Sequence, residues 1–262
     1  MLPVNSVYDV IGRHEIMKIT GNTVLITGGA SGIGLSIAKV FLENMNTVIV
    51  CGRNTNKLDQ VKREYPGIHC IQCDVSNPIG LTHMHEHLSS NFPSLNILVN
   101  NAGIQHQYDF FKDESALRKI DEEIDINFRA VARLTKIVLA NLIKAPEAAI
   151  INVSSFLGII PKKSAPIYCA TKAALHAFSK SLRYQLQGTP VKVFEIITPL
   201  VDTEMTKGRE DDAGKMSPDI LAREVMRNIE LDRYEVKPGR TKLVLFLNRV
   251  VPSLIQRVVG KR

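Results

Sequence analysis

Residues 22–34 read NTVLITGGASGIG, a short apolar run that passes directly into a turn containing four glycines. A glycine-rich turn between a strand and a helix presents unpaired backbone N–H groups and the positive end of a helix dipole to an anion. Gly28, Gly32 and Gly34 stand as G-x-x-x-G-x-G, which differs from the G-x-G-x-x-G dinucleotide fingerprint. The stretch predicts a strand, a pyrophosphate-binding turn and a helix, with a purely structural turn as the alternative.

Apolar, β-branched runs like this one recur along the chain, separated by longer segments with helical periodicity. They occupy residues 22–27, 47–52, 68–73, 95–100, 149–155 and 191–197. Strands that are apolar at every position are typical of a parallel sheet covered by helices on both faces. The pattern predicts one doubly wound Rossmann-type α/β domain. A long helix is expected from Pro166 to about Gly188, because proline suits a first helical turn and glycine a helix end.

Length and composition fit one such domain. The chain has 262 residues, 45% hydrophobic and 23% charged, and can bury an extensive core. No apolar stretch approaches the roughly 20 residues of a membrane-spanning helix, and the N-terminus lacks a signal-peptide block. We therefore expect a cytoplasmic protein. Residues 1–20 are expected to be a peripheral extension with Met17 as an alternative start, 21–238 the main domain, 239–262 a basic tail, and 203–219 a mobile loop or lid.

Two motifs could suggest metal binding. Cys70 and Cys73 form the pair in HCIQC, but residues three apart on a strand point to opposite faces, and no second cysteine pair completes a zinc site. His83 and His87 in THMHEH could share a helical face, but no further ligand is near them in the sequence. Structural thiols, a solvated helix surface and no metal site are expected.

The net charge of +7 belongs to the C-terminal tail. Seven basic residues and no acidic one lie between Lys237 and Arg262, so the preceding residues have no net charge. The body therefore lacks the basic excess of a nucleic-acid-binding surface. Residues 240–260 predict two short helices broken at Pro252, whose apolar surface must be covered. Packing on the domain or a homodimer or homotetramer interface is expected, with peripheral contact to an anionic membrane as the alternative.

Four motifs together resemble the short-chain dehydrogenase/reductase family over about residues 21–238. They are Thr27-Gly28-x-x-x-Gly32-x-Gly34, the run Asn100-Asn101-Ala102-Gly103, Ser155 thirteen residues before Tyr168, and Lys172 four residues after it. The resemblance implies a mostly parallel seven-stranded sheet, a nicotinamide dinucleotide, oxidoreductase activity and commonly a dimer or tetramer. Within the family, the CGR that ends the second strand and the PG-containing tail resemble NADP-preferring small bacterial oxidoreductases of the DltE type.

The end of the second expected strand bears on the choice of nucleotide. NAD-binding folds place a carboxylate there, which accepts hydrogen bonds from the ribose hydroxyls. This strand ends TVIVCGRN, with Gly52 in the place of the acid and Arg53 next. The planar fork of an arginine can bind a phosphate bidentately, so the sequence favours NADP over NAD. Ser31 could add a phosphate contact; the alternative for Arg53 is a solvated loop residue.

The resemblance also places residues along the dinucleotide. It implies Asp74 at the adenine edge, Asn100 and the Ala102–Gly103 turn under the nucleotide backbone, and Thr203 at the nicotinamide amide. Leu200 departs from the family, which usually has glycine after this proline, and its side chain is expected to alter the local path or the substrate pocket. The predicted cofactor residues are Thr27, Gly28, Ser31, Gly32, Ile33, Gly34, Arg53, Asp74, Val75, Asn101, Ala102, Gly103, Tyr168, Lys172, Pro199, Val201 and Thr203.

The chemistry is predicted to depend on Tyr168. On a helix, Lys172 shares its face, and a neighbouring ammonium and a helix N-terminus both lower the phenol pKa from about 10. Tyr168 is therefore the predicted general acid/base. Ser155 is expected to stabilise the charge that develops on a carbonyl oxygen; Ser154 is its neighbour, but the thirteen-residue spacing favours Ser155. By resemblance, Lys172 also binds the nicotinamide ribose and Asn127 holds a proton-relaying water.

These residues predict an NADP(H)-dependent oxidoreductase acting on a carbonyl or secondary alcohol with a largely apolar skeleton. The side chains expected near the substrate are mostly apolar: Gln105, His106, Leu157, Leu200 and Met205. The alternative is a non-catalytic dinucleotide-binding sensor or interaction protein that uses the tail or lid. Loss of one residue of the set Asn127, Ser155, Tyr168 and Lys172 would favour that alternative, and all four are present.

Overall fold

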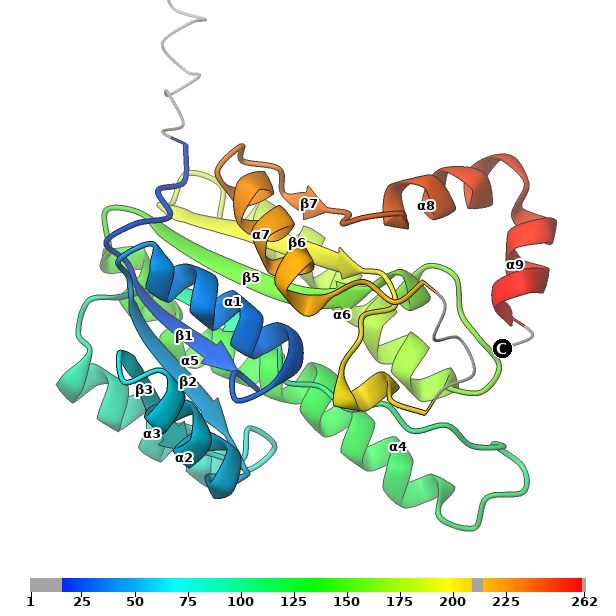
Figure 1. The fold of residues 1–262 in the computed structure, drawn as a ribbon, viewed down its shortest axis with the longest axis horizontal. Coiled ribbons are helices and arrows are strands. Elements are labelled where there is room, and N and C mark those ends of the chain that lie inside the picture. Colours follow the sequence, from blue (N-terminus) through cyan, green and yellow to red (C-terminus); the bar gives the residue numbers. More distant parts are fainter. Residues whose placement is uncertain (1–15, 209–213, 261–262) are drawn as a thin grey trace, which may run out of the picture.

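The fold is built on a single sheet of seven strands (Figure 1). In this computed structural model, which describes residues 16–208 and 214–260, the strand order is β3-β2-β1-β4-β5-β6-β7 and every neighbouring pair is parallel. The strands are β1 (Thr23–Thr27), β2 (Thr47–Gly52), β3 (Ile68–Gln72), β4 (Leu95–Asn100), β5 (Ala148–Ser155), β6 (Val191–Thr198) and β7 (Glu235–Val236). The predicted doubly wound fold is confirmed, and its sheet is parallel throughout.

Helices cover both faces of the sheet, as the uniformly apolar strands require. α1 (Gly32–Glu43), α2 (Thr55–Glu64) and α7 (Pro218–Ile229) pack on one face, and α3 (Pro78–Asn91), α5 (Ala130–Lys144) and α6 (Pro166–Gln185) on the other. Val24 and Ile26 of β1 face the first group and Leu25 the second, because successive strand residues point to opposite sides. The helix expected from Pro166 is confirmed as α6, and Gly188 follows it with a φ of 80°.

The strand order reverses between β1 and β4, which lie side by side although β2 and β3 separate them in sequence. In an open parallel sheet, ligands bind outside the carboxyl ends of the strands at such a switch point. The predicted site residues follow these ends. They are carried by the turn after β1, the turn after β4, the end of β5 and the first turns of α6.

Shorter elements shape the carboxyl edge of the sheet. α4 (Ala116–Ile124) continues through a π-helical turn, η2 (Asp125–Arg129), into α5, and two 3₁₀ turns, η3 (Phe156–Gly158) and η4 (Glu204–Thr206), follow β5 and β6. The lid expected at 203–219 is joined to the segment before it, because the backbone of Met216 bridges to Val201. Residues 209–213 lie outside the described residues, so the mobility of that segment stays a prediction.

The two ends of the chain differ in how they pack. Met17 is 2% exposed and belongs to the core on the α1 side, so packed structure begins before residue 21; residues 1–15 lie outside the described part. The tail forms the two expected helices, α8 (Thr241–Val250) and α9 (Pro252–Gly260), on either side of the expected break (Figure 1). Across the described residues, no helix has both the length and the apolar character needed to cross a bilayer.

Candidate functional site

The turn after β1 needs its glycines, because other parts of the protein pack closely against its backbone. Gly28 and Gly32 have φ values of 63° and 54°, a region that favours glycine. A Cβ on Gly28 would lie 3.0 Å from the Ala102 Cα, and one on Gly34 would lie 2.4 Å from the Gly28 oxygen. Gly29, which the sequence reasoning passed over, has the same constraint, because its Cβ would meet the Val50 side chain at 2.6 Å. Ser31, at the N-terminus of α1, makes no side-chain cap hydrogen bond, so the first backbone N–H groups of the helix have no side-chain cap and can serve an anion.

Thr27 and Asn101 tie this turn to the turn after β4. Thr27 Oγ1 accepts hydrogen bonds from the N–H groups of Asn101 and Ala102, both at 3.0 Å. The Asn101 amide donates to the carbonyls of Thr27 and Gly28 at 2.9 and 3.1 Å. Asn100, expected beneath the nucleotide, instead turns into the protein interior, where its amide donates to Asn152 Oδ1 at 2.8 Å. Asn101 therefore shapes the dinucleotide side of the site.

Tyr168 and Lys172 lie together in the interior of the cleft. Both are buried, at 8% and 5% exposure, and the Lys172 Nζ lies 5.7 Å from the centre of the Tyr168 ring. Nζ donates a hydrogen bond of 2.8 Å to the Val153 carbonyl, which fixes its position. Burial lowers the pKa of Lys172 to about 8, and the carboxylate of Glu195 partly opposes that shift. Burial thus makes the positive charge of Lys172 energetically costly, and this charge lies beside the phenol of Tyr168.

The two serines that end β5 have different partners. Ser154 faces inward, where its Oγ donates to the Glu195 carboxylate. Ser155 Oγ accepts the N–H of Leu157 at 3.2 Å and begins the η3 turn. Leu157 in turn packs against Tyr168. The hydroxyl of Ser155 is therefore held at the start of the segment that leads to Tyr168. Ser154, and not Ser155, is among the residues that line the cavity with Tyr168 and Lys172, so the choice of Ser155 over Ser154 stays a prediction.

Asn127 is fully buried in the π-helical turn η2. Its Oδ1 accepts the N–H of Ile104 at 2.8 Å, and its amide donates to the Ile104 carbonyl at 2.9 Å and to Thr171 Oγ1 at 3.2 Å. A Cβ on Gly103 would lie 3.3 Å from Asn127 Oδ1 and 3.7 Å from Lys172 Nζ. Asn127 therefore holds the loop after β4 close to the lysine; its expected water-holding role stays a prediction.

A cavity of about 220 Å³ joins the glycine turn to the tyrosine. Met205 lines it, as the sequence predicted for a substrate neighbour. Leu200 is not among the lining residues; its carbonyl accepts the N–H of Met216 at 2.9 Å. Val201, a predicted cofactor residue beside Pro199, is buried in the core at 4% exposure. The predicted cofactor residues that line this cavity are Gly28, Ser31, Gly32, Ile33, Asn101, Ala102, Gly103, Tyr168, Lys172 and Thr203.

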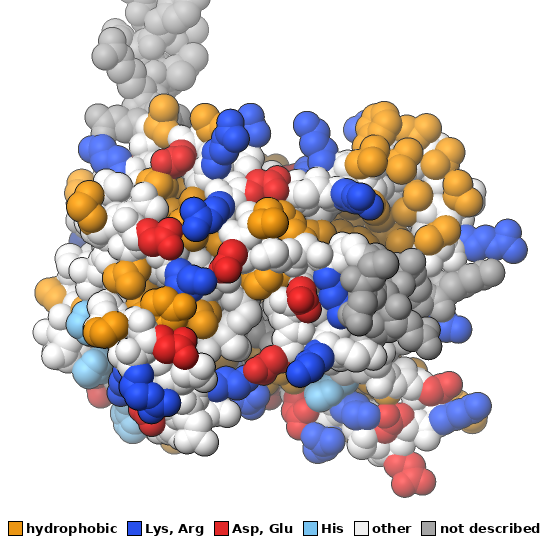
Figure 2. All heavy atoms as spheres, viewed as in Figure 1, with side chains coloured by type: hydrophobic (Ala, Val, Ile, Leu, Met, Phe, Trp, Pro, Cys, Tyr) orange, Lys and Arg blue, Asp and Glu red, His pale blue; other side chains and the backbone are white. Residues whose placement is uncertain are grey.

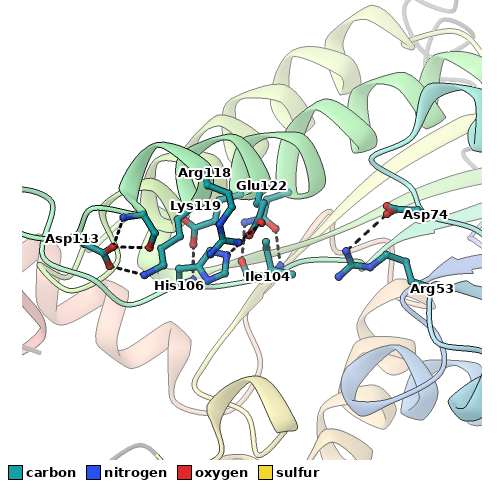
Figure 3. Close-up of polar contacts among 11 residues, drawn as sticks. Arg53, Asp74, Ile104, His106, Asp113, Arg118, Lys119 and Glu122 are labelled. Atoms are coloured by element: carbon teal, nitrogen blue, oxygen red, sulfur yellow. Dashed lines mark hydrogen bonds and ion pairs between the residues drawn. The ribbon is translucent and has the colours of Figure 1, made fainter.

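A second hollow extends from the glycine turn toward Arg53 and Asp74, whose side chains face each other in Figure 3. It is lined in part by Gly28, Arg53, Asp74 and Val75. Arg53 Nη1 lies 3.9 Å from Asp74 Oδ2, and the two side chains are 58% and 40% exposed. The other Asp74 oxygen accepts both the N–H and the hydroxyl of Ser76. The guanidinium thus faces the hollow and is held only loosely by its carboxylate.

His106, a predicted substrate neighbour, is engaged by carboxylates on the side of α4 (Figure 3). The ring atom Nε2 of His106 lies 2.9 Å from Glu122 Oε2, and the backbone N–H of His106 donates to Glu123 Oε1 at 2.8 Å. Glu123 is fully buried, and burial raises its pKa. His106 lines a third hollow together with Arg53 and Arg118. It serves to anchor the loop after β4 more than to contact a substrate in the cavity beside Tyr168.

The sequence reasoning missed a buried polar cluster beneath Lys172. Glu195 of β6 is fully buried and bonds to Ser154 on the neighbouring strand and to His176 Nδ1 at 2.7 Å. His176 lies one helical turn beyond Lys172 on α6. The signal was available as an acid within the apolar run VKVFEII, because a lone carboxylate inside a buried strand must be paired.

The cysteines and the α3 histidines are the other residues with possible metal-ligand chemistry. Burial raises the pKa values of the thiols of Cys51 and Cys73, the latter to about 11, so both are unreactive. His83 and His87 lie on the exposed face of α3. Within residues 16–208 and 214–260, no group of three or more histidine, cysteine or acidic side chains could hold a metal ion.

Known proteins share this architecture. Residues 22–214 match the family described as short chain dehydrogenase. DltE of Bacillus subtilis, an uncharacterized oxidoreductase, is 47% identical over 198 residues, which cover 76% of this chain and 79% of that protein. The NADP-dependent 3-hydroxy acid dehydrogenase YdfG of Salmonella typhimurium is 33% identical over 198 residues, covering 73% and 79%.

Solved structures agree on the fold. A short chain dehydrogenase from Burkholderia cenocepacia in complex with NADP has a TM-score of 0.80 to this chain at 21% identity, covering 94% of this chain and 100% of that one. The resemblance inferred from four short motifs therefore extends over most of the sequence and over the whole sheet. On these grounds the chain belongs to the short-chain dehydrogenase family and is an oxidoreductase of that family.

Proposed function

We propose that the protein is an NADP(H)-dependent oxidoreductase that moves a hydride between the nicotinamide and a carbonyl or secondary alcohol on a largely apolar substrate. The observation that supports this most is the placement of Tyr168 and Lys172 in the same cavity as the glycine turn. Gly28 and Gly32 line this cavity where α1 begins, and Ser31 makes no side-chain cap to the helix, so the residues present fit a pyrophosphate at the helix N-terminus. The dinucleotide, when bound, supplies or accepts the hydride.

The protein's own residues supply the proton. In the direction of reduction, Tyr168 Oη gives its proton to the carbonyl oxygen as the carbon gains hydride, and the Lys172 ammonium favours the resulting phenolate. Ser155 donates a hydrogen bond to the same oxygen while negative charge develops there. Asn127, by holding the loop after β4 beside Lys172, positions the route by which the tyrosine regains a proton from solvent.

NADP is the preferred cofactor in this proposal. Gly52 stands where an acid would repel a 2′-phosphate, and Arg53 faces the hollow that leaves the glycine turn. The guanidinium is only loosely engaged by Asp74, so it is free to bind a phosphate. The relative YdfG, named as NADP-dependent, supports the same choice. A homodimer or homotetramer, common in the family, stays a prediction.

A comparison of Tyr168→Phe with Tyr184→Phe tests the proposal. Tyr184 lies on the same helix but is 63% exposed, so its variant controls for a lost phenol hydroxyl on α6. With NADPH and a panel of apolar ketones and 3-oxo acids, Tyr168→Phe should bind NADPH like the wild type and lose at least about a hundredfold in kcat. Wild-type turnover by Tyr168→Phe would overturn the assignment, and NADPH binding without turnover of any carbonyl by the wild type would favour the sensor alternative.

A further inference from the structure

The C-terminal helices expose a set of apolar side chains, which we call the tail face. It consists of Leu243, Phe246 and Val250 on α8, and Leu254 and Val258 on α9. Their exposures are 55%, 61%, 61%, 58% and 50%. Residues three or four positions apart share one side of a helix, so each helix presents a single apolar stripe. Figure 2 shows this apolar gathering over α8 and α9.

The last turn of α9 contacts the domain. Val259 packs on the cluster formed by Leu157, Ala165, Tyr168 and Cys169. The Gly260 carbonyl accepts the N–H of Lys163 at 3.3 Å. These contacts hold the last turn of α9 beside the segment that leads to Tyr168, while the side chains of the tail face remain exposed.

Basic residues border the tail face. Lys242 and Arg249 lie along one edge of the α8 stripe and Arg257 along one edge of the α9 stripe, as their spacing dictates; all three are exposed. From Lys237 onward the chain has seven basic residues and no acid, while the rest of the sequence has no net charge. Figure 2 shows basic side chains around the apolar gathering. An apolar stripe edged by Lys and Arg is the pattern of an interfacial helix.

The distribution of charge distinguishes between two possible partners of the tail face, a second copy of the chain and an anionic bilayer. In a two-fold dimer the same patch meets itself, so two tail faces would bring basic residues against basic residues with no acid to pair them. An anionic bilayer provides an apolar layer at the depth of the stripe and negative charge at its border. Helices of 10 and 9 residues are about half the length that a bilayer-spanning helix requires, so they can only lie in the interface.

We propose that the tail face binds the surface of an anionic lipid bilayer, with α8 and α9 lying in the plane of the interface. The aromatic ring of Phe246 and the aliphatic side chains enter the acyl boundary, while Lys242, Arg249 and Arg257 remain at the headgroups. The proposal is independent of the reaction that the protein catalyses.

Flotation of the full-length protein with vesicles tests it. Vesicles of phosphatidylcholine mixed with phosphatidylglycerol should carry the protein, vesicles of phosphatidylcholine alone should not, and added salt should weaken binding. Phe246→Ser/Leu254→Ser should lose binding on the order of a hundredfold, as expected when about 3 kcal/mol of apolar burial is removed. Phe111→Ser/Leu117→Ser, at 94% and 78% exposure and outside α8 and α9, is the matched control and should bind normally.

A charge series completes the experiment. Lys242→Gln/Arg249→Gln/Arg257→Gln should lower binding by a similar factor, since each basic residue near an anionic surface contributes about 1 kcal/mol. Lys62→Gln/Arg63→Gln/Arg227→Gln removes three exposed basic residues elsewhere and should not. Thermal melting and NADPH binding report whether each variant is folded.

Three results would overturn the proposal. They are no flotation with anionic vesicles at low salt, equal flotation by the Phe246→Ser/Leu254→Ser variant, and conversion of an oligomer to a monomer by that variant without any vesicle binding. The last result, read by sedimentation velocity, would make the tail face an interface between copies. Tyr168→Phe should float like the wild type, which separates this outcome from a failure of the proposed function.

Discussion

Glu195 Oε2 lies 2.7 Å from His176 Nδ1 within the buried layer between β6 and α6. The carboxylate has no solvent exposure, and its other oxygen accepts the hydroxyl of Ser154. Its charge acts on Lys172, whose pKa it raises against the larger effect of burial. The charge of Lys172 is therefore balanced between a costly desolvation and a buried counter-charge.

Glu195→Gln should change the pH dependence of the reaction. The amide keeps the size of the side chain but removes its charge, so the pKa of Lys172 should fall below its present value of about 8. The basic limb of the profile of kcat/KM should then move to lower pH, with activity at pH about 9 reduced several-fold more than activity at pH about 7. Glu230→Gln, on the exposed end of α7, is the control. An unchanged profile would show that Glu195 acts only in packing.

Lys172 should also make stability depend on pH. The pKa of this lysine is lowered from 10.5 to about 8 in the folded protein, so between these values the unfolded chain binds more protons and the free energy of unfolding rises with pH. Relative to Lys172→Met, the wild-type apoprotein should gain about 2 kcal/mol between pH about 7 and about 9.5. Urea denaturation of both proteins at the two pH values measures this difference; parallel curves would contradict the burial of the charge.

Gly158 should not tolerate a side chain. A Cβ there would lie 2.7 Å from the carbonyl carbon of Lys172 and 2.8 Å from the Ala173 nitrogen, so Gly158→Ala must push η3 away from α6. We expect a loss of about 1–3 kcal/mol in stability and a fall in kcat. Gly80→Ala, whose Cβ would meet its nearest atom at 3.4 Å, is the control in thermal melting and activity assays. Equal melting temperatures for the two variants would show that the contact relaxes freely.

Much of the fold was predictable because its signals are local. The apolar runs predicted six strands to within one residue at either end. Pro166 and Gly188, as start and end signals, predicted α6. β7 has only two residues, too few to form a recognisable run, and became expected only through the family. The boundary at residue 21 was set too late, since the burial of Met17 depends on contacts with elements far along the chain.

The relative positions of site residues could be predicted when the residues lie on one helix or strand. They were harder to predict when the contact joins different helices, strands and loops. The proximity of Tyr168 and Lys172 follows from helical spacing, whereas their assignment to the site comes from the resemblance to the family. The roles of Asn100 and Asn101 could not be separated from sequence, because strand register decides that one joins the interior network and the other clamps the glycine turn. The anchoring of His106 by Glu122 and Glu123 likewise depends on how α4 packs beneath the loop after β4.

Arg53→Ala should identify the cofactor. If the guanidinium binds the 2′-phosphate, the variant should lose at least about tenfold in affinity for NADPH, or about 1.4 kcal/mol, and keep its affinity for NADH. Arg63→Ala removes an exposed arginine from the neighbouring helix α2 and controls for the general effect of positive charge on a polyanionic ligand. Fluorescence titration of both cofactors against the three proteins measures the ratio at fixed salt. An equal loss for NADPH and NADH would assign Arg53 to the pyrophosphate, and no loss for either would leave it a solvated loop residue beside Asp74.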